Sequence, residues 1–186
     1  LAEGPAVKYG RVVVGKTGHF EFEKKPGVPQ RFYGVNFCFS ALYLEKDQVD
    51  RLMDRLVRLG YNTIRIHHYE GELSGGWGSS RNSLDFIPEK VDQLDYFFAA
   101  AKVRGLYVTT DLYVSRPVKP ADVGMTGEGI NLKLLIPFHE PSFENWKAFC
   151  RKLLGHVNPY TKIAWKDDPA LAWLVPVNED NYLNSL

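Results

Sequence analysis

Apolar residues along the chain alternate between short runs of strand type and longer stretches of helical spacing. The short apolar runs cover residues 31–37, 61–66, 106–111 and 171–177. The stretches between them place apolar side chains three and four positions apart, as on one face of a helix, over residues 46–59, 85–104 and 143–157. Strands that are apolar throughout and separated by amphipathic helices are typical of a parallel sheet covered by helices.

The segments outside this alternation also have clear signals. Residues 11–22 combine a run of valines, a glycine-containing turn and alternating phenylalanines, which predicts a β-hairpin. Gly60 and Gly105 each follow a predicted helix directly, where a glycine ends a helix readily. The Gly- and Ser-rich residues 71–83 and the proline-containing residues 114–142 are expected to form loops.

Four β/α units fit either half of a (β/α)₈ barrel or a small open sheet. An open sheet that binds nucleotides needs a glycine-rich turn after its first strand, so that backbone N–H groups can approach phosphates. The chain instead reads Cys-Phe-Ser-Ala-Leu-Tyr-Leu after Phe37. We therefore predict a parallel sheet with its four strands in sequential order, curved as half of a barrel.

Composition excludes several classes of partner. The 186 residues carry a net charge of +1, so there is no basic excess for nucleic acid or an anionic membrane. No apolar run approaches the roughly 20 residues of a membrane span. Cys38 and Cys150 stand far apart in the sequence and form no metal-binding motif. We expect both to be free buried thiols, with a disulfide between them as the alternative.

Polar and ionisable residues cluster at the carboxyl ends of the predicted strands, where barrel enzymes place their catalytic groups. In chain order they are Asn36, Arg65, His67, His68, Tyr69, Glu70, Asp111, Tyr113, Asn178, Glu179, Asp180 and Asn181.

Each of these positions also has a structural explanation. Arg65 alternates with Ile64 and Ile66 and so points into the barrel, as a structural ion pair or as a functional clamp. His67 and His68 are adjacent, so we expect them to point to opposite sides, with at most one facing the cleft. Asp111 fits a cap or a substrate contact. Glu179 is the hardest to explain structurally, because it follows an apolar strand and an asparagine.

The segment Val177-Asn178-Glu179, after the lead-in Asp-Asp-Pro-Ala-Leu-Ala, resembles the fourth strand of clan A glycoside hydrolases, particularly the cellulase-like family 5 group. The resemblance extends to residues 32–37, 59–65 and 105–111, which look like the first three strands of that family. There are two departures: Leu112-Tyr113 stands where the family often has a histidine, and Asp180 stands where it usually has proline.

The resemblance implies a TIM barrel whose first four β/α units are residues 31–186, with residues 1–30 as a hairpin and lead-in that cover the barrel floor. It implies retaining hydrolysis of a β-linked glycan without a cofactor or metal, and an extracellular, secreted or periplasmic location. Glu179 would be the general acid/base, Asn178 would bind the sugar 2-hydroxyl, and Arg65 would hold the nucleophile. The remaining candidates for the substrate cleft are His67, His68, Tyr69, Trp77, Asp111 and Tyr113.

The family's nucleophile is a glutamate on the seventh strand, and this chain ends after the fourth. We therefore expect the partner to be the missing C-terminal half of the barrel, and the chain alone to be inactive. Two alternatives remain open: an inverting hydrolase that uses Asp111 with Glu179, and a sugar-binding half-barrel without catalysis.

Overall fold

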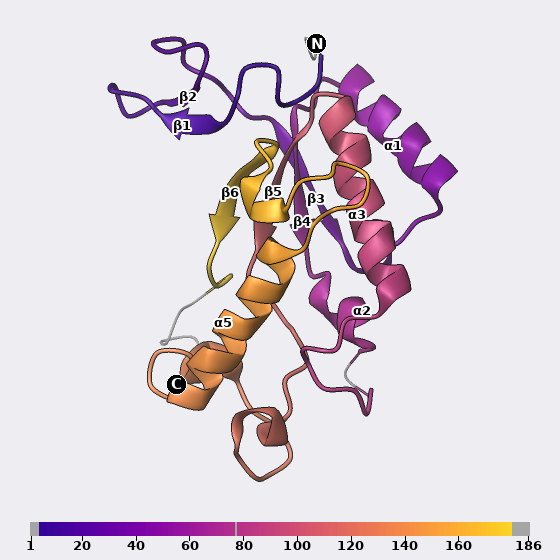
Figure 1. Ribbon diagram of the computed structural model, residues 1–186, viewed down its shortest axis with the longest axis vertical. Helices are drawn as coiled ribbons and strands as arrows, with labels where there is room; N and C mark the ends of the chain where they lie inside the picture. Colours follow the sequence, from indigo (N-terminus) through magenta and orange to yellow (C-terminus); the bar gives the residue numbers. More distant parts are fainter. Residues whose placement is uncertain (1–3, 77, 180–186) are drawn as a thin grey trace.

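The computed structural model describes residues 4–76 and 78–179, and the architecture is that of a half-barrel preceded by a hairpin (Figure 1). Four strands form one parallel sheet in the order β3-β4-β5-β6. They are β3 (Gly34–Cys38), β4 (Thr63–His67), β5 (Tyr107–Asp111) and β6 (Leu171–Val175). Both the parallel pairing and the sequential strand order confirm the prediction.

Three long helices connect these strands. They are α1 (Lys46–Arg58), α3 (Pro88–Val103) and α5 (Glu140–Gly155). All three lie within a few residues of their predicted bounds, and Gly60 and Gly105 adopt the positive φ angles of +87° and +82° that favour glycine after a helix. Figure 1 shows α1 and α3 side by side along the sheet.

Short helical segments interrupt the predicted loops. They are η1 (Phe39–Leu42), α2 (Glu70–Ser74), η2 (Pro120–Val123), α4 (Leu132–Leu135) and η3 (Trp165–Asp167). None was predicted, because a segment of three to five residues is too short to show a helical period.

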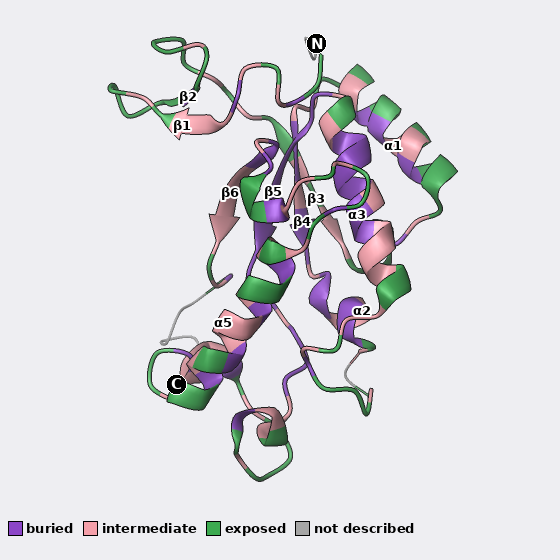
Figure 2. Cartoon of the chain, viewed as in Figure 1, coloured by how far each residue is buried: buried purple, intermediate pink, exposed green. Residues whose placement is uncertain are grey.

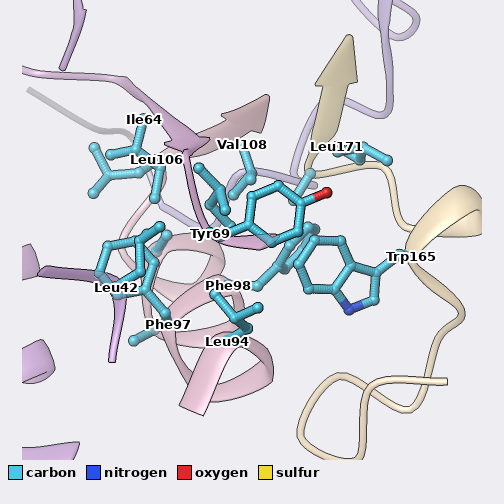
Figure 3. Packing of buried hydrophobic residues seen from close by; sticks show 14 of the residues in the cluster. Leu42, Ile64, Tyr69, Leu94, Phe97, Phe98, Leu106, Val108, Trp165 and Leu171 are labelled. Carbon is cyan, nitrogen blue, oxygen red and sulfur yellow. The ribbon is translucent and has the colours of Figure 1, made fainter. Parts of the chain in front are cut away.

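The main core lies between the sheet and the helices. Ile64 and Val108 from the two central strands face Leu94, Phe97 and Phe98 from α3 (Figure 3). The burial colours of Figure 2 show the same pattern, with β5 and the inner face of α3 buried and β6 only half-buried. The two central strands are therefore covered on their helix side, and the edge strands β3 and β6 keep much of their surface exposed.

The predicted hairpin is confirmed as the antiparallel pair β1 (Val12–Val14) and β2 (Phe20–Phe22). Its aromatic rings contact the sheet near the amino ends of the strands. Phe20 stacks on Trp173 at 5.6 Å between ring centroids, and Phe22 stacks on Tyr107 at 5.1 Å. The hairpin thus leaves the opposite, carboxyl-terminal edge of the sheet open for a site.

Both cysteines are free thiols and half-buried. Burial raises the pKa of the Cys38 thiol, and it raises that of Cys150 to about 11, so both stay protonated at neutral pH. Within the described residues, no helix is long and apolar enough to cross a membrane.

Candidate active site

The centre of the candidate site is a charged network that joins three of the parallel strands. Arg65 on β4 forms a two-point ion pair with Asp111 on β5, in which its Nε donates to Asp111 Oδ2 at 3.1 Å and its Nη2 donates to Oδ1. The same Nη2 donates to Asn178 Oδ1 at 2.8 Å, beyond the end of β6. The inward position predicted for Arg65 therefore provides an ion pair, which anchors the residue before Glu179.

His67 extends this network. Its Nδ1 lies 2.7 Å from Asp111 Oδ2, and the carboxylate is fully buried. A buried carboxylate needs donors, and here three nitrogens from Arg65 and His67 supply them. With Nδ1 donating to Asp111, the Nε2 of His67 is the ring nitrogen left to meet a ligand.

The general acid/base candidate, Glu179, lies at the same edge of the sheet. Its side chain is 80% exposed, and its Oε2 lies 3.9 Å from Lys133 Nζ. The preceding Asn178 is fixed by two bonds, since its backbone N–H donates to Tyr113 O at 2.9 Å and its Oδ1 accepts from Arg65. With Oδ1 held by Arg65, the Nδ2 of Asn178 can donate to a sugar hydroxyl.

The two adjacent histidines differ from the prediction. Their ring centroids are only 4.3 Å apart, so they do not point to opposite sides of the strand. The reason is the backbone, because His68 follows the last residue of β4 and has a φ of +47°, which ends the strand alternation. The Nδ1 of His68 lies 2.8 Å from Ser115 Oγ, and burial and the neighbouring His67 lower the pKa of His68.

Three of the candidate cleft residues lie in the interior. Tyr69 and Asp111 are fully buried and Tyr113 is 5% exposed, which differs from a role in direct contact with substrate. Tyr69 instead packs in the core and donates its hydroxyl proton to Asp111 O at 2.7 Å. The candidate Trp77, and Asp180 and Asn181, lie outside the described residues.

A second buried carboxylate stabilises the segment that contacts His68. Glu70 is fully buried at the start of α2 and accepts hydrogen bonds from the backbone N–H groups of Val114 at 2.9 Å and Ser115 at 3.0 Å. Ser115 in turn contacts His68, so Glu70 fixes the segment that holds this histidine. Burial raises the pKa of Glu70 to about 7, although the two N–H donors and the charge of Arg116 oppose the shift.

This pKa predicts a pH dependence of stability. The folded protein holds the proton of Glu70 up to about pH 7, and the unfolded chain releases it near the ordinary value of 4.5. Protonation of Glu70 therefore adds to the free energy of unfolding. This contribution is fully present below pH 4.5 and is lost as the pH rises to about 7. This prediction concerns the protein translated from the complete gene, which is called the complete protein below. As the pH rises from 5 to 8, we expect the titration of Glu70 to lower its free energy of unfolding by about 2 kcal/mol.

Urea unfolding of the complete protein at several pH values measures this effect. Glu70→Gln keeps the size of the side chain and removes the titration, so the variant is expected to lose this part of the slope. Equal slopes for the two proteins between pH 5 and 8 would show that Glu70 does not titrate in this range.

Glu70 belongs to the polar cluster predicted at the strand ends, but the sequence did not single out Ser115, Lys133 or Phe39 as members of the site. Ser115 and Lys133 come from the segment predicted as a long loop and reach the site only through tertiary contacts. Among the described residues, no group of three or more His, Cys, Asp or Glu side chains is arranged to hold a metal ion.

Comparisons with known proteins identify the class of fold. No family model matches the chain, and no curated protein matches it. Among solved structures, the chain is similar to the endo-1,4-β-mannanase of Rhizomucor miehei, with 17% identity, a TM-score of 0.69 and coverage of 92% of this chain and 48% of the other. It is similar in the same way to the family 5 mannosidase of Rhizomucor miehei, with 13% identity, a TM-score of 0.70 and coverage of 93% and 49%.

A third similar structure is the endo-β-1,4-mannanase of Thermotoga petrophila, with 20% identity, a TM-score of 0.61 and coverage of 82% of this chain and 36% of the other. The chain thus spans about half the length, or less, of these three solved structures. At these identities the likeness shows the fold. The chain has the fold of half of a family 5 glycoside hydrolase barrel, as the sequence motifs predicted.

Proposed function

We propose that this chain provides the acid/base half of a retaining glycoside hydrolase that acts on a β-linked glycan. The observation that carries the proposal is the position of Glu179. Its carboxylate is exposed at the carboxyl-terminal edge of the sheet, directly after an asparagine fixed by Arg65. This is the edge at which barrel enzymes carry out their chemistry.

In the proposed mechanism, Glu179 first protonates the leaving glycosidic oxygen. As the glycosidic bond breaks, a second carboxylate bonds to the anomeric carbon and forms a glycosyl ester. The deprotonated Glu179 then removes a proton from water, which attacks the anomeric carbon and breaks this ester bond. Asn178 Nδ2 donates to the sugar 2-hydroxyl. Arg65 donates a hydrogen bond from its guanidinium to the second carboxylate, which acts as the nucleophile.

The second carboxylate of a retaining enzyme lies about 5–5.5 Å from the first. Asp111 does not fit this role, because it is fully buried and already accepts from Arg65 and His67. The same bonds argue against an inverting pair of Asp111 and Glu179, since a general base must be free to accept a proton from water. We propose that a further four β/α units supply the nucleophile and cover the exposed side of Glu179.

Mannan is the first substrate to test, because the three similar structures are named as mannanases or a mannosidase. The complete protein is incubated with β-1,4-mannohexaose, and the anomeric configuration of the first products is followed by NMR. Hydrolysis to the β-anomer is expected for a retaining enzyme. Formation of the α-anomer would establish inversion, and binding without hydrolysis would favour a sugar-binding protein.

A further inference from the structure

An exposed aromatic ring stands at the site on a backbone conformation that is unfavourable for its residue type. Phe39 follows β3 directly, on the edge that carries Arg65 and Glu179, and is 56% exposed. Its φ is +53°, in the left-handed region that is unfavourable for a residue with a Cβ atom. Burial does not offset this cost, so a function in this conformation is the better explanation.

The imidazole of His68 covers one face of the Phe39 ring. The two rings stack with centroids 4.9 Å apart and an angle of 22° between their planes. His68 also has a positive φ, of +47°, and the Phe39 N–H donates to His68 O at 3.2 Å. Ser115 Oγ lies 2.8 Å from His68 Nδ1, so the imidazole is fixed on its other side.

His68 also places the pair of rings near the reacting groups. Its ring centroid lies 4.3 Å from that of His67, whose Nδ1 contacts Asp111, and the charges of Asp111, Glu179 and Lys133 influence the pKa of His68. Burial is the largest influence and lowers the pKa of His68, so the imidazole is neutral at pH 7. A neutral ring stacked under a phenyl ring makes a flat, uncharged surface beside the acid/base.

We propose that Phe39, stacked on His68, is a platform for one pyranose ring of the glycan and forms a sugar subsite beside Glu179. The inference rests on the proposed function for its ligand class. The C–H groups on one face of a pyranose are apolar, and an exposed aromatic ring of fixed orientation binds such a face with little loss of side-chain freedom. The strained backbone at Phe39 and at His68 fixes that orientation.

Phe39→Gly tests the platform in the complete protein, because glycine adopts a positive φ without strain and removes only the ring. We expect the KM for β-1,4-mannohexaose, and its Kd by titration calorimetry, to rise about threefold to tenfold. The unfolding temperature should not fall. Phe39→Trp keeps a flat ring and should keep the affinity of the unmodified protein.

Tyr33→Ala is the matched control. Tyr33 is 60% exposed and stacks on Tyr61 with centroids 4.6 Å apart, but it lies at the other end of β3, away from the site. This variant should bind mannohexaose like the unmodified protein. A loss of affinity equal to that of Phe39→Gly would overturn the platform.

The remaining outcomes separate the platform from the proposed function. If Phe39→Gly lowers the unfolding temperature and leaves the Kd unchanged, Phe39 is a packing residue and the platform is overturned. If the complete protein binds mannohexaose without hydrolysing it, and Phe39→Gly weakens the binding, the platform holds and the hydrolase proposal fails. If neither mannohexaose, cellohexaose nor xylohexaose binds, both fail.

Discussion

Glu179→Gln in the complete protein is expected to lower the kcat for mannohexaose about 10²- to 10⁴-fold. Glutamine keeps the size of the side chain and can still contact the glycosidic oxygen, but it has no acidic proton to transfer to the leaving group. The binding of mannohexaose should therefore remain near that of the unmodified protein. Initial rates of sugar release and calorimetric titration measure the two quantities.

The leaving group provides an internal control. A 2,4-dinitrophenyl glycoside needs little protonation to depart, so its cleavage step should be much less impaired by Glu179→Gln. Glu128→Gln is the matched variant, since Glu128 is an exposed glutamate in the loop before α4, and it should keep the full rate. A wild-type rate of Glu179→Gln on mannohexaose would remove Glu179 from the mechanism.

Asp111→Ala is expected to lower the free energy of unfolding of the complete protein by about 3 kcal/mol. The carboxylate is fully buried and accepts from Arg65 and His67, so its removal leaves polar groups inside the protein without their partner. Arg65 keeps its bond to Asn178 and is one-quarter exposed, which limits the loss. Urea unfolding at pH 7 measures the change.

Asp47→Ala is the comparison on the surface. Asp47 pairs with Arg51 one helical turn away, with both side chains about two-thirds exposed, and such a pair contributes only about 0.3–0.5 kcal/mol. A similar small change for Asp111→Ala would show that the three-strand network does not hold the site together.

The strands and their order could be predicted from the sequence because each strand carries its own signal. Residues 61–66 and 106–111 are largely apolar runs that follow a helix-ending glycine. The first is followed directly by His67, and the second ends in Asp111. Parallel pairing follows from the helices between them. The inward position of Arg65 could be predicted in the same way, since a strand alternates its side chains between two faces.

The details of the site depend on backbone conformations that break these rules. The positive φ angles of Phe39 and His68 end the alternation just where the site begins, so the shared position of the two histidines was not predictable. The burial of Tyr69 depends on α2, which is too short to show a period. The contact between Lys133 and Glu179 joins the short helix α4 to the segment after β6, and no local sequence pattern indicates it.

The most direct test of the account is covalent labelling of the complete protein with 2,4-dinitrophenyl 2-deoxy-2-fluoro-β-mannoside, followed by mass spectrometry of the peptides. The fluorine slows the second step, so the sugar stays attached to the nucleophile of a retaining enzyme. The account predicts one labelled carboxylate outside residues 1–186, with Glu179 unlabelled. A label on Glu179, or on any other residue of this chain, would contradict the assignment of this chain as the acid/base half.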